Sequence, residues 1–195
     1  MTSRSPIPFP GQPTPSVGFE APFDMLSACH ERVERSLALL ERLMVHVARM
    51  GADASARQAA LDVMRYFDLA APLHHQDEEL HVFPRLLAGP DVALQQLAHR
   101  LIAEHRSMEL AWQEARASLV ALVEETSGGE QAIGPPQRPV WPTDAQLAQL
   151  RAFAQLYRRH LSDEDRLVYP VALSHLDPSS LQHMGEEMEA RRRAS

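Results

Sequence analysis

A histidine and a glutamate four residues apart occur twice in this chain. The first pair is His74 and Glu78, and the second is His160 and Glu164. Imidazole nitrogens and carboxylate oxygens are ligands that iron, manganese and zinc accept. Because residues four apart on a helix are separated by only about 40° around its axis, each pair points to one side, one turn apart. The repetition predicts metal chemistry.

Two further features recur with each pair. An aromatic–proline dipeptide follows at the same distance from the histidine, first as Phe83-Pro84 and then as Tyr169-Pro170. A lone histidine on an earlier helical segment precedes each pair, His30 before the first and His105 before the second. Six ligands in a two-fold internal repeat suggest a site for two metal ions.

Apolar periodicity predicts the four long helices that must position these residues. The expected limits are about 23–50, 53–83, 91–126 and 143–169, with Asp53 and Ser55, and either Thr143 or Asp144, as caps and Gly51 as a stop. Pro72 should bend the second helix just before His74, and Pro84 and Gly89-Pro90 should end it. No strand pattern competes, so we predict an all-α fold, an antiparallel up-down four-helix bundle.

The chain divides into one domain and two tails. Residues 1–20 hold five prolines and predict a flexible arm, residues 21–176 form the predicted bundle, and residues 177–195 predict a short C-terminal helix. This helix should pack on the bundle or on a second copy of the chain, which would make a homodimer. The basic run 191–193 is interpreted as a solvated helix end.

The ligands fall on the apolar stripes of the predicted helices. Phe67 and Phe153 each stand seven residues before the histidine of a pair, and Leu101 and Trp112 flank His105. Buried imidazoles and carboxylates without partners cost several kcal/mol each, on the order found for isolated polar groups. Cations would supply those partners, so two ions in the bundle core are favoured over four separate core histidines.

Composition excludes several classes. The 195 residues, 45% hydrophobic, suit one well-buried core. A formal net charge of −7 argues against a general nucleic-acid binder. Apolar runs are too short for a membrane span and no signal peptide is evident, so a cytoplasmic protein is expected. Cys29 is the only cysteine, so a metal site must use histidine and carboxylate.

The lone histidines, the histidine–glutamate pairs and the aromatic–proline dipeptides together resemble the hemerythrin-like, HHE cation-binding family. The resemblance covers roughly residues 23–176. It implies an up-down four-helix bundle with two non-haem irons, bridged by two carboxylates and an oxo or hydroxo oxygen derived from solvent. Glu78 and Glu164 would be the bridging carboxylates. The implied ligands are His30, His74, Glu78, His105, His160 and Glu164.

The chain departs from the oxygen-carrying hemerythrins at Glu109, where they have a fifth histidine one turn after the histidine of the third helix. We include Glu109 in the predicted metal site, as a ligand or as a group that holds a neighbouring imidazole. Glu34, one turn after His30, has the same two roles open to it. An extra carboxylate favours ferric iron and so weighs against reversible oxygen carriage.

Neighbouring polar residues are expected to have other roles. His75 should be exposed or should support a ligand. His81, seven residues after His74, should return to the inner face as a core residue, a hydrogen-bond donor, part of an access route or a ligand. Four acidic residues beside the ligands are interpreted as a solvated face. They are Asp77, Glu79, Asp163 and Asp165.

Two classes of function follow. The favoured one is a non-enzymatic di-iron module that binds oxygen, nitric oxide or peroxide, or that senses iron or redox state. The alternative is a di-iron enzyme acting on peroxide, nitric oxide or oxygen. Manganese and zinc are alternative metals for such ligands, and a metal-free or zinc-filled structural bundle is the third interpretation.

Overall fold

The computed structural model describes residues 18–127 and 141–194, and all regular structure in these two ranges is helical. The predicted all-α class is confirmed. Residues 1–17 of the predicted arm and the proline-rich connection between the third and fourth predicted helices lie outside the described residues. Within the described part, no helix is both long and apolar enough to cross a membrane.

Eight α-helices and three π-helical turns make up the described residues. They are α1 (Pro22–Met50), α2 (Ala54–Arg65), η1 (Tyr66–Ala70), α3 (Ala71–Asp77), η2 (Glu78–Val82), α4 (Phe83–Leu87), α5 (Val92–Ser127), α6 (Asp144–Asp163), η3 (Glu164–Val168), α7 (Tyr169–Ser174) and α8 (Pro178–Ala194).

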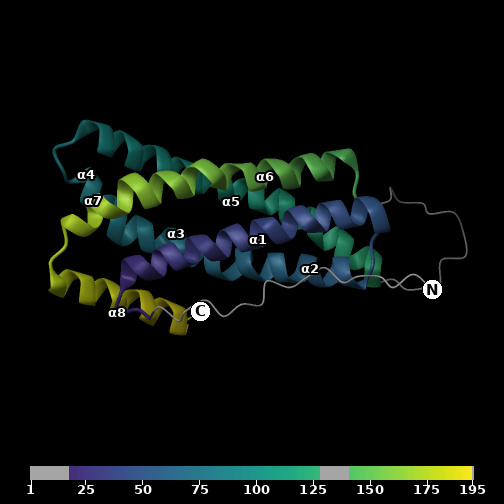
Figure 1. Ribbon diagram of the computed structural model, residues 1–195, viewed down its shortest axis with the longest axis horizontal. Coiled ribbons are helices and arrows are strands. Elements are labelled where there is room, and N and C mark those ends of the chain that lie inside the picture. The colour runs from purple at the N-terminus through teal and green to yellow at the C-terminus, as the bar shows by residue number, and fades with distance from the viewer. Residues whose placement is uncertain (1–17, 128–140, 195) are drawn as a thin grey trace, which may run out of the picture.

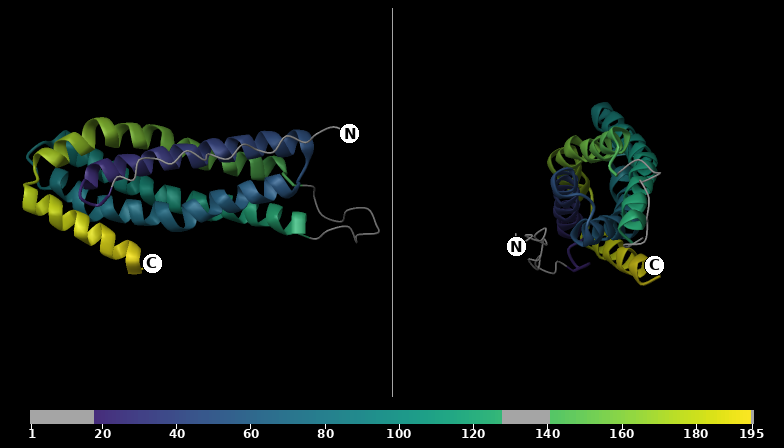
Figure 2. Two further views of the ribbon diagram at one scale, coloured as in Figure 1. Left: turned by 60° about the horizontal axis from the view of Figure 1, so that its bottom comes forward. Right: turned by 90° about the vertical axis from the view of Figure 1, so that its right-hand side faces the viewer.

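These elements form four long rods that lie side by side (Figure 1). The rods are α1, the run from α2 to α4, α5, and the run from α6 to α7. Both α1 and α5 pack on α2 and on α6, so the four rods enclose one interior, as the end-on view in Figure 2 shows. The shorter α8 packs against α1 and α3 on the outside of this helical bundle.

The helix ends follow the sequence signals. Asp53 accepts a hydrogen bond from the backbone N–H of Ala56 at the start of α2. Thr143 and Gln146 form a reciprocal capping box at the start of α6, so Thr143 rather than Asp144 is the cap. Gly51 ends α1 with a φ of 79°, a backbone conformation that costs little only for glycine.

The prediction that Pro84 ends the second helix is wrong, but that helix does end, at Leu87, just before the predicted Gly89-Pro90. The fourth helix continues past the predicted limit at Tyr169, through Pro170 to Ser174. Pro84 and Pro170, like Pro72, each stand second in a helix that directly follows a π-helical turn. Proline lacks the N–H that an α-helix needs and its ring crowds the preceding turn, and one extra residue in that turn relieves the conflict.

The core consists of two apolar clusters separated along the bundle. The larger cluster draws on α1, α2, α5 and α6, and includes Leu40, Phe67 and Phe153. The smaller cluster, at the end where α4, α7 and α8 meet, includes Phe83 and Val168. Buried polar side chains lie between the two clusters, and they form the site described next.

Candidate metal centre

A layer of six polar side chains crosses the bundle between its two apolar clusters. On α5, for example, Leu101 belongs to the smaller cluster and Met108 to the larger one, and His105 lies between them. Every rod contributes to this layer, and no residue in it is more than 3% exposed. The six residues are His30, His74, Glu78, His105, His160 and Glu164.

The π-helical turns set the position of the two glutamates. Glu78 is the first residue of η2 and Glu164 is the first residue of η3, each one turn after the histidine of its pair. The backbone N–H that closes each wide turn is that of the aromatic residue before the proline. The aromatic–proline dipeptide therefore shapes the turn that begins at the glutamate of each pair.

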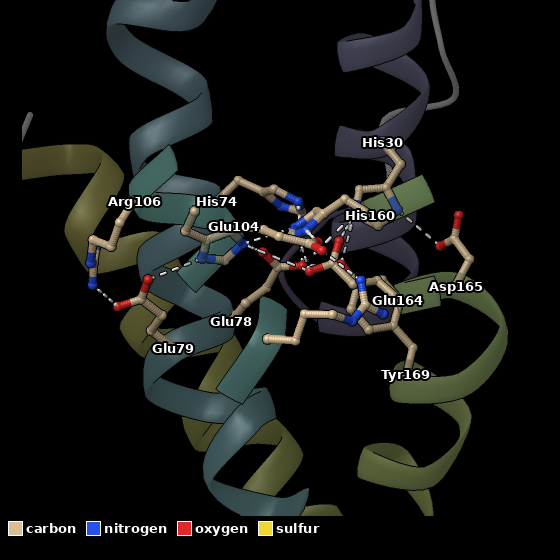
Figure 3. Close-up of polar contacts among 12 residues, drawn as sticks. His30, His74, Glu78, Glu79, Glu104, Arg106, His160, Glu164, Asp165 and Tyr169 are labelled. Carbon is tan, nitrogen blue, oxygen red and sulfur yellow. Dashed lines mark hydrogen bonds and ion pairs between the residues drawn. The ribbon is translucent and has the colours of Figure 1, made fainter. Parts of the chain in front are cut away.

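Both glutamates face two groups of histidines at once. One oxygen of Glu164 is 3.3 Å from His30 Nε2 and the other is 2.9 Å from His160 Nε2. Likewise one oxygen of Glu78 is 3.5 Å from His74 Nε2 and the other is 3.4 Å from His105 Nε2. Each carboxylate thus offers one oxygen to the pair His30 and His74 and one to the pair His105 and His160. The two glutamates therefore lie between the two pairs of histidines (Figure 3).

A second carboxylate lies behind three of the four imidazoles. Because an ionised carboxylate only accepts hydrogen bonds, each of these imidazoles donates through Nδ1–H, and in its neutral form it turns the lone pair of Nε2 toward the layer. Such partners fix the orientation of metal-binding histidines. The Nδ1–carboxylate pairs are His30 with Asp165 at 3.0 Å, His105 with Glu79 at 3.0 Å and His160 with Glu104 at 2.9 Å.

This arrangement leaves lone pairs facing one another. The Nε2 atoms of His105 and His160 are 3.0 Å apart, and neutral imidazoles held this way would bring two lone pairs together. Both nitrogens of His74, both oxygens of Glu164 and one oxygen of Glu78 are buried without a hydrogen-bond partner. Buried groups of this kind destabilise a fold unless a partner satisfies them. Cations fit the donor set and would serve these atoms, apart from Nδ1 of His74, which lies on the other edge of the ring.

The pKa values of the histidines also indicate that the layer favours positive charge. Burial lowers the pKa of His30, but the surrounding carboxylates outweigh burial and raise that pKa to about 12. The same balance raises the pKa of His105 to about 10. Burial lowers the pKa of His74 to about 4. Because metals bind neutral imidazole, metal ions and protons compete for this layer.

Comparison with known proteins agrees with this geometry. Residues 21–172 match the family model described as the hemerythrin HHE cation binding domain. The chain belongs to the hemerythrin HHE family. The HHE region spans all four rods and all six residues of the buried layer, so cation binding is the property that the family assigns to this bundle. A Haemophilus influenzae protein described as uncharacterized is 29% identical over 182 residues, which cover 93% of this chain and 95% of that protein.

The structure does not bring Glu109 to the metal layer of the HHE domain. Its side chain is 49% exposed and pairs with Arg106 on the outside of α5. The inner face of α5 after His105 continues at Met108, three residues on, because packed helices repeat their contacts every 3.5 residues on average. Glu34 is exposed as well, so neither carboxylate completes the layer.

The two further histidines lie outside the layer. His75 is buried, with its ring stacked on that of His105 at 3.9 Å between centroids. His81 turns away toward α8, where its Nε2 lies 2.9 Å from the guanidinium of Arg191 and 3.2 Å from Glu187. The π-helical turn η2 inserts one residue between His74 and His81, which rotates His81 off the inner face.

The interpretation of the flanking acids and of the terminal arginines as solvated is wrong for Asp77, Arg191 and Arg192, and it holds for Asp165 and Arg193, whose side chains are 43% and 76% exposed. Asp77 is fully buried and pairs with Arg191 and Arg192 of α8, each at 2.6 Å. Glu79 and Asp165 hold imidazoles of the layer, as described above, and Asp163 pairs with Arg100. Arg191 and Arg192 instead attach α8 to the rod that carries the first histidine–glutamate pair.

Two residues at the layer were not predicted. Glu104 holds His160, and the hydroxyl of Tyr169 lies between His30 and Glu78. For Glu104 the sequence held a usable signal. An acidic residue directly precedes His105, just as acidic residues directly follow Glu78 and Glu164. Acids placed next to ligands are candidates to hold the opposite imidazoles.

Proposed function

We propose that this HHE domain binds a pair of iron ions in its buried layer and uses them to bind oxygen, nitric oxide or peroxide, or to sense iron or redox state. The observation that carries the proposal is that Glu78 and Glu164 each offer one oxygen to each pair of histidines. The antiparallel up-down order of the four rods belongs to the proposal, and the short connections at residues 51–53 and 88–91 support it.

In this proposal His30 and His74 hold one ion, His105 and His160 hold the other, and both glutamates are shared. The iron pair supplies a centre that accepts small ligands and changes oxidation state. The protein's own carboxylates keep three imidazoles oriented through Nδ1, which presents neutral Nε2 atoms to the ions. The two apolar clusters on either side exclude water from the layer.

Burial supports a small ligand. All six ligands are at most 3% exposed, so an organic substrate would reach them only if the rods separated. A diatomic molecule or peroxide needs no such movement. The enzymatic alternative uses the same ions, with turnover of peroxide, nitric oxide or oxygen following the binding step.

The test is anaerobic reconstitution with ferrous iron, with iron counted per chain and optical spectra taken before air, in air and after deoxygenation. We expect about two irons per chain and a spectrum that air changes. Reversal on deoxygenation supports oxygen binding, and a change that persists until a reductant is added supports sensing or an enzyme, which peroxide turnover then separates. Fewer than one bound iron per chain after iron supplementation would refute the proposal and favour a structural bundle.

A matched pair of variants localises the binding. Glu164→Gln keeps the size of a shared ligand but removes its charge, and we expect loss of at least one of the two irons. Glu109→Gln makes the same change on the outside of α5, and we expect full iron content. Equal iron content in both variants would contradict the assignment of the layer.

A further inference from the structure

The hydroxyl group of Tyr169 lies inside the layer of metal ligands. Tyr169 is the first residue of α7, directly after η3, and its side chain is buried. Its oxygen is 2.9 Å from His30 Nε2 and 2.5 Å from an oxygen of Glu78 (Figure 3). Its ring stacks on the imidazole of His30, with centroids 5.2 Å apart. Packing thus holds the phenol of Tyr169 against the pair His30 and His74.

The distances match those between donors that share an ion. Ligand atoms about 2.1 Å from a metal, at right angles to one another, are separated by about 3 Å. The donors around His105 and His160 show this spacing. His160 Nε2 is 2.9 Å from an oxygen of Glu164 and 3.0 Å from His105 Nε2. The oxygen of Tyr169 has the same spacing to His30 and a slightly shorter one to Glu78.

The single proton of this hydroxyl cannot serve both of its neighbours once His30 is neutral. Metal binding requires a neutral His30, and because its Nδ1 donates to Asp165, its Nε2 presents a lone pair. The phenol then faces two acceptors, this nitrogen and the Glu78 carboxylate, with a single proton. A cation placed among the three atoms would satisfy all of them.

The internal repeat makes the phenol specific to one half of the site. Phe83 stands at the same distance after His74 as Tyr169 does after His160, and it also follows a π-helical turn. Its ring lies 5.5 Å from that of His105, on the side of the second pair of histidines, and it carries no donor atom. The pair His30 and His74 therefore has an oxygen donor that the pair His105 and His160 lacks.

We propose that Tyr169 is an additional metal ligand, which binds through its phenolate oxygen to the ion held by His30 and His74. The phenol releases one proton to solvent when it binds. The two metal positions are then chemically different. This inference rests on the proposed function, because it needs an ion between the histidines.

Ferric iron makes the inference directly measurable. A phenolate bound to ferric iron gives a strong visible charge-transfer band, and excitation into that band enhances tyrosine ring vibrations, which imidazole and carboxylate cannot produce. The chain has three tyrosines, so the signal can be assigned by substitution. The full-length protein is loaded with iron and oxidised, the iron is counted, and the optical and resonance Raman spectra are recorded for wild type, Tyr169→Phe and Tyr157→Phe.

Tyr157 is the matched control, because it is buried near the layer with its ring 6.4 Å from that of His75. We expect the phenolate signal in wild type and in Tyr157→Phe, and its complete loss in Tyr169→Phe. An iron-loaded wild type without the signal would overturn the inference and leave the iron pair in place, as would a signal that survives in Tyr169→Phe. If Tyr169→Phe fails to fold, the spectrum of the iron-loaded wild type still tests the inference, because the phenolate signal must be present in it. A wild type that binds no iron would overturn the proposed function, and the inference with it.

Discussion

Three of the four imidazoles in the buried layer are oriented by carboxylates that lie outside the layer. Asp165, Glu79 and Glu104 each accept a hydrogen bond from Nδ1 of a ligand imidazole. A histidine left without such a partner could rotate or place its proton on Nε2, and either change would remove a ligand. His74 has no such partner in the structure, so its orientation depends on packing alone.

Replacing one of these carboxylates should weaken metal binding without removing a ligand. We expect Glu104→Gln to lower metal affinity by about 10- to 100-fold, because the amide no longer fixes the charge and tautomer of His160. Competition with a chelator of known affinity measures this change. Glu109→Gln is the control, and an equally large loss in that exposed variant would show that the effect is not specific to the layer.

At the scale of elements, local sequence signals determine where the helices and the π-helical turns begin and end. Each π-helical turn lies directly before an aromatic or alanine residue and a proline, and two of these turns begin at a ligand glutamate. Simple caps govern the ends far from the site. Asp53 caps α2 and also contacts His46 of α1 at 3.0 Å, so one side chain joins the first two rods.

The Asp53 cap predicts a pH-dependent loss of stability. Burial raises the pKa of Asp53, but the N–H of Ala56 and the His46 imidazole lower it by more, so the folded pKa lies below the ordinary 3.8. Its charge therefore stabilises the fold above that value, and this contribution disappears as pH falls through the folded pKa. We expect Asp53→Ala to lose about 1 kcal/mol at neutral pH, measured by urea unfolding of the apoprotein.

A conservative variant separates the cap from the charge. Asparagine is nearly as good a cap as aspartate, so Asp53→Asn should cost less than Asp53→Ala. The difference in unfolding free energy between wild type and Asp53→Asn should also shrink as the pH falls toward about 3, because the Asp53 carboxylate becomes protonated there. A difference that stays constant with pH would contradict a role for the charge.

At the scale of the whole molecule, α8 is attached through a buried charge. Asp77, directly before the ligand Glu78, is fully buried and pairs with Arg191 and Arg192. We expect Asp77→Asn to destabilise the protein by about 3 kcal/mol, because two guanidinium groups lose a buried countercharge. Arg193→Met is the control in chemical denaturation: Arg193 is 76% exposed and should cost less than about 0.5 kcal/mol.

Metal should stabilise the bundle as a whole. Ligands that bind only the folded state stabilise it by mass action, by about 4 kcal/mol at a thousandfold excess over Kd, so chelation should lower Tm by roughly 10 °C. In His74→Ala we expect a smaller loss of Tm in the metal-free protein than in the metal-loaded one, measured by calorimetry. Equal losses with and without iron would contradict a role for this side chain in metal binding.

The sequence by itself determined the features that depend on neighbours along the chain. Apolar periodicity and caps predicted the four rods, and the spacing of each histidine–glutamate pair put both side chains on one face of a helix. Those pairs and the two lone histidines do lie together in the buried layer. Local geometry suffices here because residues four apart on a helix are neighbours in any fold.

Only the tertiary structure decided which other residues join them. Met108 rather than Glu109 faces the interior because the packing of α5 selects the third position after His105, a choice that the sequence left open. Asp77 and Arg192 are 115 residues apart and meet only because α8 packs on α3. Tyr169 of α7 and His30 of α1 likewise meet only through packing between distant segments. Contacts between distant segments depend on how whole helices dock, and no local spacing encodes that.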